Sequence, residues 1–154
     1  MAAVAPIRLA DYTPWAFSLP AIELDFDIQS DHVVVSSRLE LRPQASSSPL
    51  LLRGVDLTIE SLAIDEVPLE PSEWSYEAGL LTITKTPAQP FVLSTRCRID
   101  PYNNSSLEGL YASCGLLSTQ CEAEGFRRIS LHPDRPDVLS QWRVRIEAPR
   151  SSCP

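Results

Sequence analysis

The sequence predicts an all-β domain, built as a sandwich or an open, curved sheet of short, mostly antiparallel strands. Three observations support this fold class. Apolar and polar residues alternate with a period of two along most of the chain. Fourteen prolines against five glycines divide the 154 residues into short segments, because proline interrupts helices and central strands. No stretch has the apolar spacing of an amphipathic helix, although 136–141 is expected to form one helical turn.

The first half of the chain shows the clearest alternation. In residues 21–29 (AIELDFDIQ), apolar residues alternate with acidic residues, which predicts a half-buried strand with an acidic outer face. Residues 32–42 predict a β-branched strand, and 43–49 a loop. Residues 49–65 predict one short and one longer strand, with a bulge near 60–61, because the apolar phase changes there.

The second half continues in the same manner. Residues 66–79 predict a proline-rich connection, and 80–85 a short strand. Residues 91–100 (FVLSTRCRID) alternate again, and 142–148 (WRVRIEA) form the last clear strand. Three residues of this last strand are expected to face inward: Trp142, Val144 and Ile146.

Composition and charge limit the classes of partner. Hydrophobic residues make up 44% of the chain, which favours one globular domain. The formal net charge of −7 argues against nucleic-acid binding, which normally requires a basic patch. No apolar run approaches the ~20 residues of a membrane span, and the first residues do not resemble a signal peptide. We therefore expect a cytoplasmic protein without a nucleic-acid or membrane partner.

The usual catalytic and metal-binding motifs are missing from the sequence. The two histidines, His32 and His132, are a hundred residues apart, there is no HExxH, and His132 is expected in a loop. The four cysteines form no CxxC pair and are expected to be free thiols, with a Cys114–Cys121 disulfide as a minor alternative. No nucleophile elbow or phosphate loop is present. We assign no catalytic residue and no metal ligand to this chain.

One polar segment, residues 118–128 (STQCEAEGFRR), raises a question of function. If it is a strand, Gln120, Glu122 and Glu124 lie on one face. The acids then form a solvated acidic edge paired with Arg127 or Arg128, or else Gln120 and Glu122 form a receptor for a free α-amino group. A glycosidase-type carboxylate pair is less favoured, because no aromatic cleft accompanies it.

Several stretches resemble the N-terminal domain of the aminopeptidase N family. The members of this family are zinc metalloaminopeptidases of the gluzincin group. The most specific are LEGLY (107–111), TQCEAEGFRRI (119–129) and DRPDV (134–138). Residues 7–28 resemble the opening of that domain, so that the resemblance covers nearly the whole chain. It implies a β domain over 1–148, followed by a divergent tail at 149–154.

The resemblance also implies a saddle-like all-β fold and a role in a divided active site. In the family, this domain packs on a thermolysin-like catalytic domain that carries HExxH, zinc and a GAMEN motif. The enzyme removes the first residue from peptides with a free amino terminus. The residue matching Glu122 binds the substrate α-ammonium group, and the residue matching Gln120 lies beside the first side chain of the substrate.

The motifs of the catalytic domain are absent from this sequence. We therefore expect the chain to be inactive alone and to hold no cofactor, with zinc belonging to the complete enzyme. The divergent tail leads us to expect a truncated product or a fragment. Two alternatives remain open: a freestanding β module that binds or regulates, and a non-functional truncated product.

Overall fold

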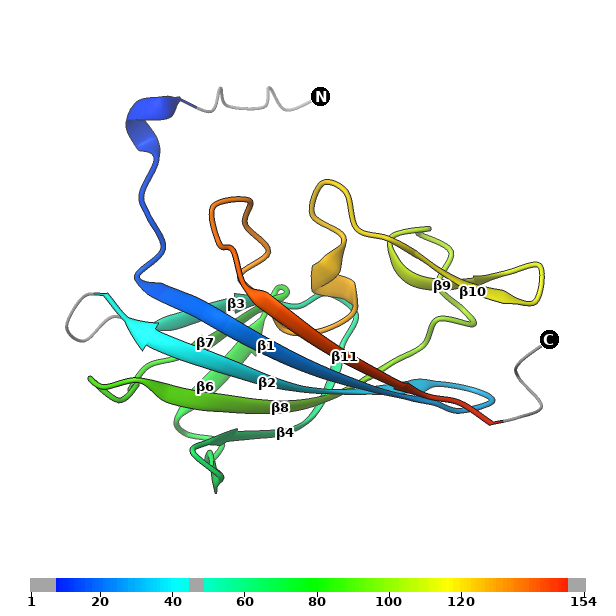
Figure 1. Ribbon diagram of the computed structural model, residues 1–154, viewed down its shortest axis with the longest axis horizontal. Helices are drawn as coiled ribbons and strands as arrows, with labels where there is room; N and C mark the ends of the chain where they lie inside the picture. Colours follow the sequence, from blue (N-terminus) through cyan, green and yellow to red (C-terminus); the bar gives the residue numbers. More distant parts are fainter. Residues whose placement is uncertain (1–7, 45–48, 150–154) are drawn as a thin grey trace.

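Strands form nearly all of the regular structure of this chain (Figure 1). The computed structural model describes residues 8–44 and 49–149, and this part contains eleven strands and two 3-10 helices. The all-β prediction is confirmed. The elements are η1 (Leu9–Asp11), β1 (Phe17–Ile28), β2 (Val33–Pro43), β3 (Leu50–Arg53), β4 (Thr58–Ile64), β5 (Val67–Pro68), β6 (Trp74–Glu77), β7 (Leu80–Ile83), β8 (Phe91–Ile99), β9 (Gly109–Ser113), β10 (Leu116–Gln120), η2 (Phe126–Arg128) and β11 (Gln141–Glu147).

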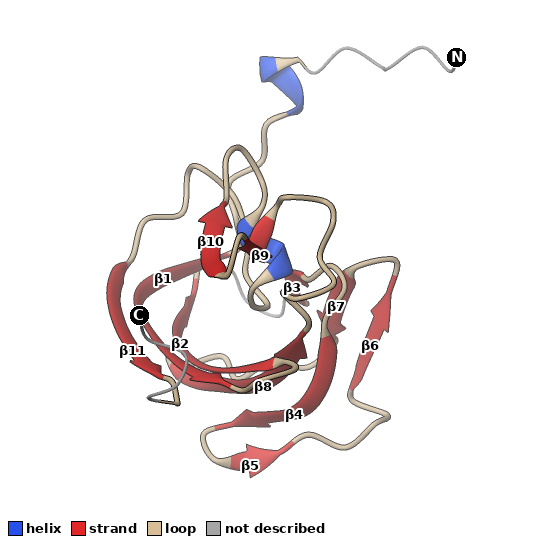
Figure 2. Cartoon of the chain, turned by 90° about the vertical axis from the view of Figure 1, so that its right-hand side faces the viewer, coloured by secondary structure: helices blue, strands red, loops and turns tan. Residues whose placement is uncertain are grey.

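The strands form three sheets. The main sheet has six strands in the order β11-β1-β2-β8-β4-β5, and a second sheet has the order β3-β7-β6. All strand pairs are antiparallel except β1 and β11, which run parallel. Figure 2 shows the main sheet as a curved layer, with the three-stranded sheet beside it and the β9–β10 hairpin above it. This arrangement agrees with the predicted open, curved assembly.

The core follows the period-two pattern of the sequence. In β8 every second residue is buried, from Phe91 to Ile99, as the alternation predicts. The bulge predicted near 60–61 is also confirmed, because the pairing of β4 with β8 shifts register between Ile59 and Ser61. Strands β3 and β7 complete the core with four side chains of 1% exposure or less: Leu50, Leu52, Leu81 and Ile83.

Two local predictions are wrong. Residues 66–79 are not only a connection, because β6 pairs with β7, and Trp74 and Tyr76 pack against the core. Residues 136–141 form no helix. The chain makes one turn, closed by the Val138 N–H on the Arg135 carbonyl oxygen at 3.3 Å, and then pairs with β1 from Gln141 onward. Residues 136–141 thus contain a single hydrogen-bonded turn, and only the last of them, Gln141, pairs with β1.

The inward orientation predicted for the last strand is also wrong. Trp142, Val144 and Ile146, which we call the β11 strip, are all exposed. They lie in register beside Ile22, Leu24 and Phe26 of β1, on the face that carries the core. The strip is therefore on the predicted face, but all three side chains remain exposed, even though the ring of Trp142 contacts Phe126 and His132.

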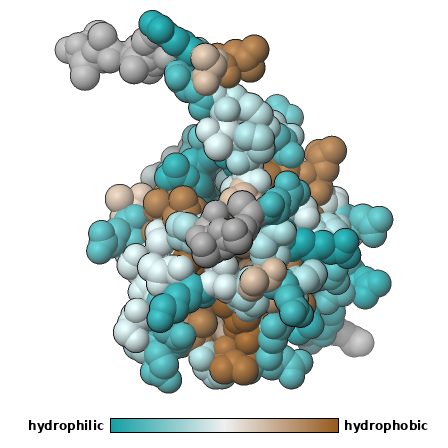
Figure 3. All heavy atoms as spheres, turned by 90° about the vertical axis from the view of Figure 1, so that its left-hand side faces the viewer, coloured by the Kyte–Doolittle hydropathy of each residue, from teal (hydrophilic) through white to brown (hydrophobic). Residues whose placement is uncertain are grey.

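The described residues around η1, 8–12, project from the body of the domain (Figures 1 and 3). Two contacts fix the base of this segment to the loop before β11. The Tyr12 hydroxyl donates to Asp137 at 2.9 Å, and Arg135 donates to the Thr13 carbonyl oxygen at 2.8 Å. In Figure 3 the visible face of the body carries apolar residues in separate patches among hydrophilic ones.

His132 lies in the connection between η2 and β11, outside the named strands as predicted, but this part of the connection is buried. The side chain of His132 is only 7% exposed, and its backbone forms an antiparallel bridge with Arg53, with hydrogen bonds of 2.7 and 3.0 Å. Nδ1 accepts a hydrogen bond from the Asp134 N–H at 2.9 Å, so the neutral ring carries its proton on Nε2. Nε2 is buried and has no hydrogen-bond partner among the described residues. Burial lowers the pKa of His132 to about 4, although the carboxylate of Asp134 opposes this shift.

We predict that His132 makes stability depend on pH between about 6.5 and about 4. In this window the unfolded chain binds a proton that the folded chain does not. The free energy of unfolding should therefore fall as the pH falls, by up to about 3 kcal/mol in total. Urea titrations at several pH values measure this loss. His132→Asn, whose Oδ1 can replace Nδ1 as the acceptor, should flatten the dependence in this window, and an unchanged slope would contradict the assignment.

We also predict strong coupling between Ser37 and Thr95. Their hydroxyl groups are 2.7 Å apart inside the core. Thr95→Val should cost about 1–3 kcal/mol, because it leaves the Ser37 hydroxyl buried without this partner. The double variant with Ser37→Ala should cost less than the sum of the two single variants. Additive losses in urea denaturation would show that the hydrogen bond contributes nothing of its own.

Candidate functional site

The segment that carries the candidate site residues is a turn, not a strand. β10 ends at Gln120, and the Gly125 N–H donates to the Cys121 carbonyl oxygen at 2.9 Å, which closes the turn before η2 begins. A side chain at Gly125 would not fit, since its Cβ would lie 2.5 Å from the Gln120 oxygen and 2.9 Å from Cys121 Cα. The prediction that Gln120, Glu122 and Glu124 share one strand face is therefore wrong.

The base of this turn is held firmly by η2. Arg127 forms an ion pair with Asp134 at 2.5 Å, and its carbonyl oxygen accepts from the Val55 N–H at 2.8 Å. Arg128 forms ion pairs with Asp56 and Glu108. These contacts join η2 to three parts of the chain: the loop before β4, the residue just before β9, and the segment that follows η2.

Phe126 provides the apolar anchor of the same base. Its ring lies 5.0 Å from the ring of His132 and 5.2 Å from that of Trp142, both in edge-to-face geometry. The rings of His132 and Trp142 are 5.4 Å apart. The three rings form one cluster, which connects the turn to β3 through His132 and to β11 through Trp142.

The tip of the turn is exposed, and its two carboxylates differ. Glu124 forms an ion pair with Arg127 at 3.0 Å, which agrees with the interpretation of an ion-paired acidic edge. Glu122 and the side chain of Gln120 have no hydrogen bond or ion pair within residues 8–44 and 49–149. In Figure 1 the turn projects on the same side as the β9–β10 hairpin and the loop before β11. Glu122 is thus an unpaired carboxylate on a well-anchored turn.

The cysteines of the described residues are all unpaired. Cys97, Cys114 and Cys121 are free, so the alternative Cys114–Cys121 disulfide is not formed, and Cys153 lies outside the described residues. Burial raises the pKa of the Cys97 thiol to about 11. Burial also raises the pKa of Cys121, with a smaller contribution from the charge of Asp134. Neither thiol has the lowered pKa that a nucleophile requires.

The residues present do not fit a zinc site. Within the described part of the chain, no group of three His, Cys, Asp or Glu residues is arranged to hold a metal ion. The same part contains no helix that is long and apolar enough to cross a membrane. The polar groups that this segment presents without a partner among the described residues are the carboxylate of Glu122 and the amide of Gln120.

Comparison with known proteins identifies relatives over nearly the whole chain. No family model matches the sequence. The chain is 47% identical over 143 residues to aminopeptidase N of Caulobacter vibrioides, a match that covers 92% of this chain and 16% of that protein. It is 39% identical over 145 residues to aminopeptidase N of Escherichia coli, covering 94% of this chain and 16% of that protein.

Solved structures agree with this relationship. Aminopeptidase A of Legionella pneumophila, solved in complex with aspartic acid, superposes with a TM-score of 0.87 at 28% identity, over 95% of this chain and 18% of that chain. Yeast leukotriene A4 hydrolase superposes with a TM-score of 0.73 at 20% identity, over 87% of this chain and 23% of that chain, and shows the fold alone. The chain spans 16% of the length of the aminopeptidases that it matches. By sequence and by fold, it is a homologue of the N-terminal region of the aminopeptidase N family.

Proposed function

We propose that this chain functions as the N-terminal domain of a zinc aminopeptidase, in which it supplies an anchor for the free amino terminus of a peptide substrate. The observation that carries the proposal is Glu122, an exposed carboxylate without a partner on a turn whose base is fixed. Its neighbour Glu124 is neutralised by Arg127. Only one of the two carboxylates is therefore free to bind a cation.

A peptide amino terminus suits this group chemically. An α-ammonium group has a full positive charge and several N–H donors, and its hydrogen bonds to a carboxylate are short and about twice as strong as neutral ones. The Gln120 side chain, at the end of β10, would lie beside the first side chain of the peptide. Because the turn is held by ion pairs and by the aromatic cluster, Glu122 would need little ordering when the substrate binds.

Cleavage would require a catalytic domain that this chain does not contain. When bound there, zinc would supply a Lewis acid and an activated water. The contribution of this chain would be to position the amino terminus of the peptide against that centre. The aminopeptidase A of Legionella pneumophila, solved with aspartic acid, supports an amino acid or peptide as the class of ligand.

The role of Glu122 can be tested in a chimaera that carries this domain in place of the matching region of Caulobacter vibrioides aminopeptidase N. Glu122→Gln should lower kcat/KM for alanyl peptides about 10- to 150-fold, because one charge-assisted contact is worth about 1.5–3 kcal/mol. Glu124→Gln is the matched control and should change kcat/KM less than about twofold. Equal effects of the two substitutions would refute the anchor.

The chain alone should not cleave peptides. With zinc added in excess and an alanyl-p-nitroanilide substrate, the release of nitroaniline should equal that of the protein-free blank. The reason is that no metal site is formed by the residues that the structure describes. Release that increases in proportion to the concentration of purified chain would contradict the assignment of the chemistry to a separate domain.

A further inference from the structure

One buried carboxylate holds the residue that follows the 121–125 turn into η2. The side chain of Asp134 is only 8% exposed. Its Oδ2 accepts two hydrogen bonds from Arg127, one from the side-chain Nε at 2.5 Å and one from the backbone N–H at 3.3 Å. Hydrogen bonds between charged groups are shorter and about twice as strong as neutral ones. The same oxygen therefore fixes both the guanidinium group and the backbone of Arg127.

Asp134 is itself fixed to the core of the domain. Its N–H donates to Nδ1 of His132 at 2.9 Å, and the backbone of His132 is bridged to Arg53, the last residue of β3. The φ angle of Asp134 is 51°, in the left-handed region that aspartate and asparagine adopt more readily than most residues. The carboxylate of Asp134 thus has a set position relative to β3, and it passes that position on to Arg127.

The turn that carries Glu122 depends on the position of Arg127. The hydrogen bond that closes the turn runs from the Gly125 N–H to the Cys121 carbonyl oxygen, so that Glu122 lies between its two ends. Arg127 follows two residues later, and its guanidinium group reaches back to Glu124 at 3.0 Å. A displacement of Arg127 would therefore strain the closing bond and move the segment on which Glu122 is held.

The burial of Asp134 distinguishes it from the other acids that pair with η2. Arg128 pairs with Asp56 and Glu108, whose side chains are 78% and 56% exposed, and Glu124 is 67% exposed. Exposed pairs of this kind contribute little, because water screens them. Loss of one partner from a buried pair costs much more, because the other charge is left without compensation. Within the described residues, Asp134 is thus the acid on which the position of η2 depends most.

We propose that Asp134 is the positioning residue of the amine anchor: it places Glu122 for the α-ammonium group of the substrate by fixing Arg127 and, through Arg127, the 121–125 turn. Asp134 does not itself contact the substrate. This role rests on the proposed function of Glu122. An amide at position 134 could accept the same two hydrogen bonds, but it has no charge with which to hold the guanidinium group, so that a carboxylate is required there.

The first test uses the full chain and needs no substrate. Asp134→Asn keeps the shape of the side chain and suits the left-handed backbone, so that the main change is the loss of charge. Hydrogen exchange measured by NMR reports opening of the turn through the Gly125 N–H that closes it. We expect the protection of this N–H to fall about fivefold or more.

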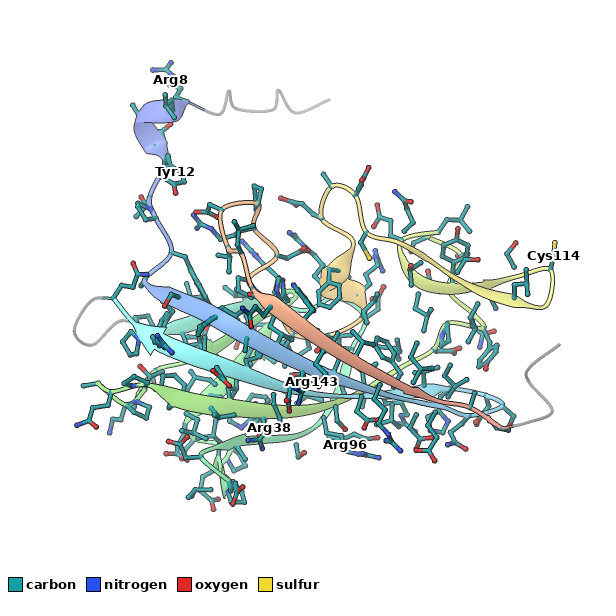
Figure 4. All side chains as sticks on the ribbon, viewed as in Figure 1. Arg8, Tyr12, Arg38, Arg96, Cys114 and Arg143 are labelled. Carbon is teal, nitrogen blue, oxygen red and sulfur yellow. The ribbon has the colours of Figure 1, made fainter. Side chains whose placement is uncertain are left out.

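Asp137→Asn is the matched control for this experiment. It removes the same charge from an ion pair in the same connection, but Asp137 pairs with Arg135 at 2.7 Å and accepts from the Tyr12 hydroxyl at 2.9 Å. Figure 4 shows Tyr12 on the segment that projects from the domain, far from the hairpin tip that carries Cys114. Protection of the Gly125 N–H should therefore change less than about twofold in Asp137→Asn.

The second test asks whether Asp134 acts through Glu122. In the chimaera with Caulobacter vibrioides aminopeptidase N, Asp134→Asn should lower kcat/KM for alanyl peptides about 5- to 30-fold, because a displaced carboxylate binds the ammonium group less well. In a chimaera that already carries Glu122→Gln, the same substitution should lower kcat/KM less than about twofold, since no anchor remains to be placed. A residue that only stabilised the fold would cause equal losses in both backgrounds.

Two further variants keep this test decisive. Thr95→Val destabilises the core at a distance from the turn and should leave kcat/KM unchanged in both backgrounds. If Asp134→Asn does not fold, Arg127→Lys disturbs the same contact more mildly, because it keeps the charge and loses the fork of donors. It should show the same dependence on Glu122, with a loss of about threefold in the parent chimaera.

The possible results separate the role of Asp134 from that of Glu122. Unchanged protection of the Gly125 N–H in Asp134→Asn would show that this carboxylate does not hold the turn. Equal losses of kcat/KM with and without Glu122 would show that Asp134 acts on the fold as a whole. Either result overturns the role of Asp134 and leaves Glu122 as the anchor. An unchanged kcat/KM in Glu122→Gln alone would refute the anchor, and the role of Asp134 with it.

Discussion

The contact among Phe126, His132 and Trp142 is the interaction on which the functional part of this structure depends. Each ring comes from a different part of the chain: the turn of the candidate site, the segment bridged to β3, and the first residues of β11. Packing of these rings against one another fixes the base of the turn without using its tip. The contact therefore holds the turn in place while its polar side chains remain exposed.

Many acidic side chains of this domain are paired locally with arginines. These arginines lie on neighbouring strands or turns, as in the pairs of Arg96 with Glu60 and of Arg145 with Asp25. Surface pairs of this kind contribute little to stability individually. Within the site segment they distinguish the two carboxylates, because Glu124 is paired with Arg127 while Glu122 has no partner among the described residues.

The alternation of residues predicted the strands well, because the period of two reports which side of a strand faces the core. It could not predict whether anything covers that side, so the burial of the β11 strip was wrong although its face was right. Long-range effects explain the other failures. His132 is buried through a bridge with Arg53, about eighty positions earlier, and the 121–125 turn depends on the close packing of Gly125 on Gln120. No pattern of apolar residues contains that information.

The candidate site shows the same division between local and non-local information. The residue types at 120, 122 and 124 allowed either an ion-paired acidic edge or, at Gln120 and Glu122, a receptor for an amine, and a strand would have made Glu122 and Glu124 equivalent. The structure separates them, since the turn places Glu124 three residues before Arg127 at ion-pair distance while Glu122 remains free. A carboxylate is most useful to a ligand when its own protein does not already neutralise it. The turn, more than the sequence of acids, is therefore what makes Glu122 available to a cation.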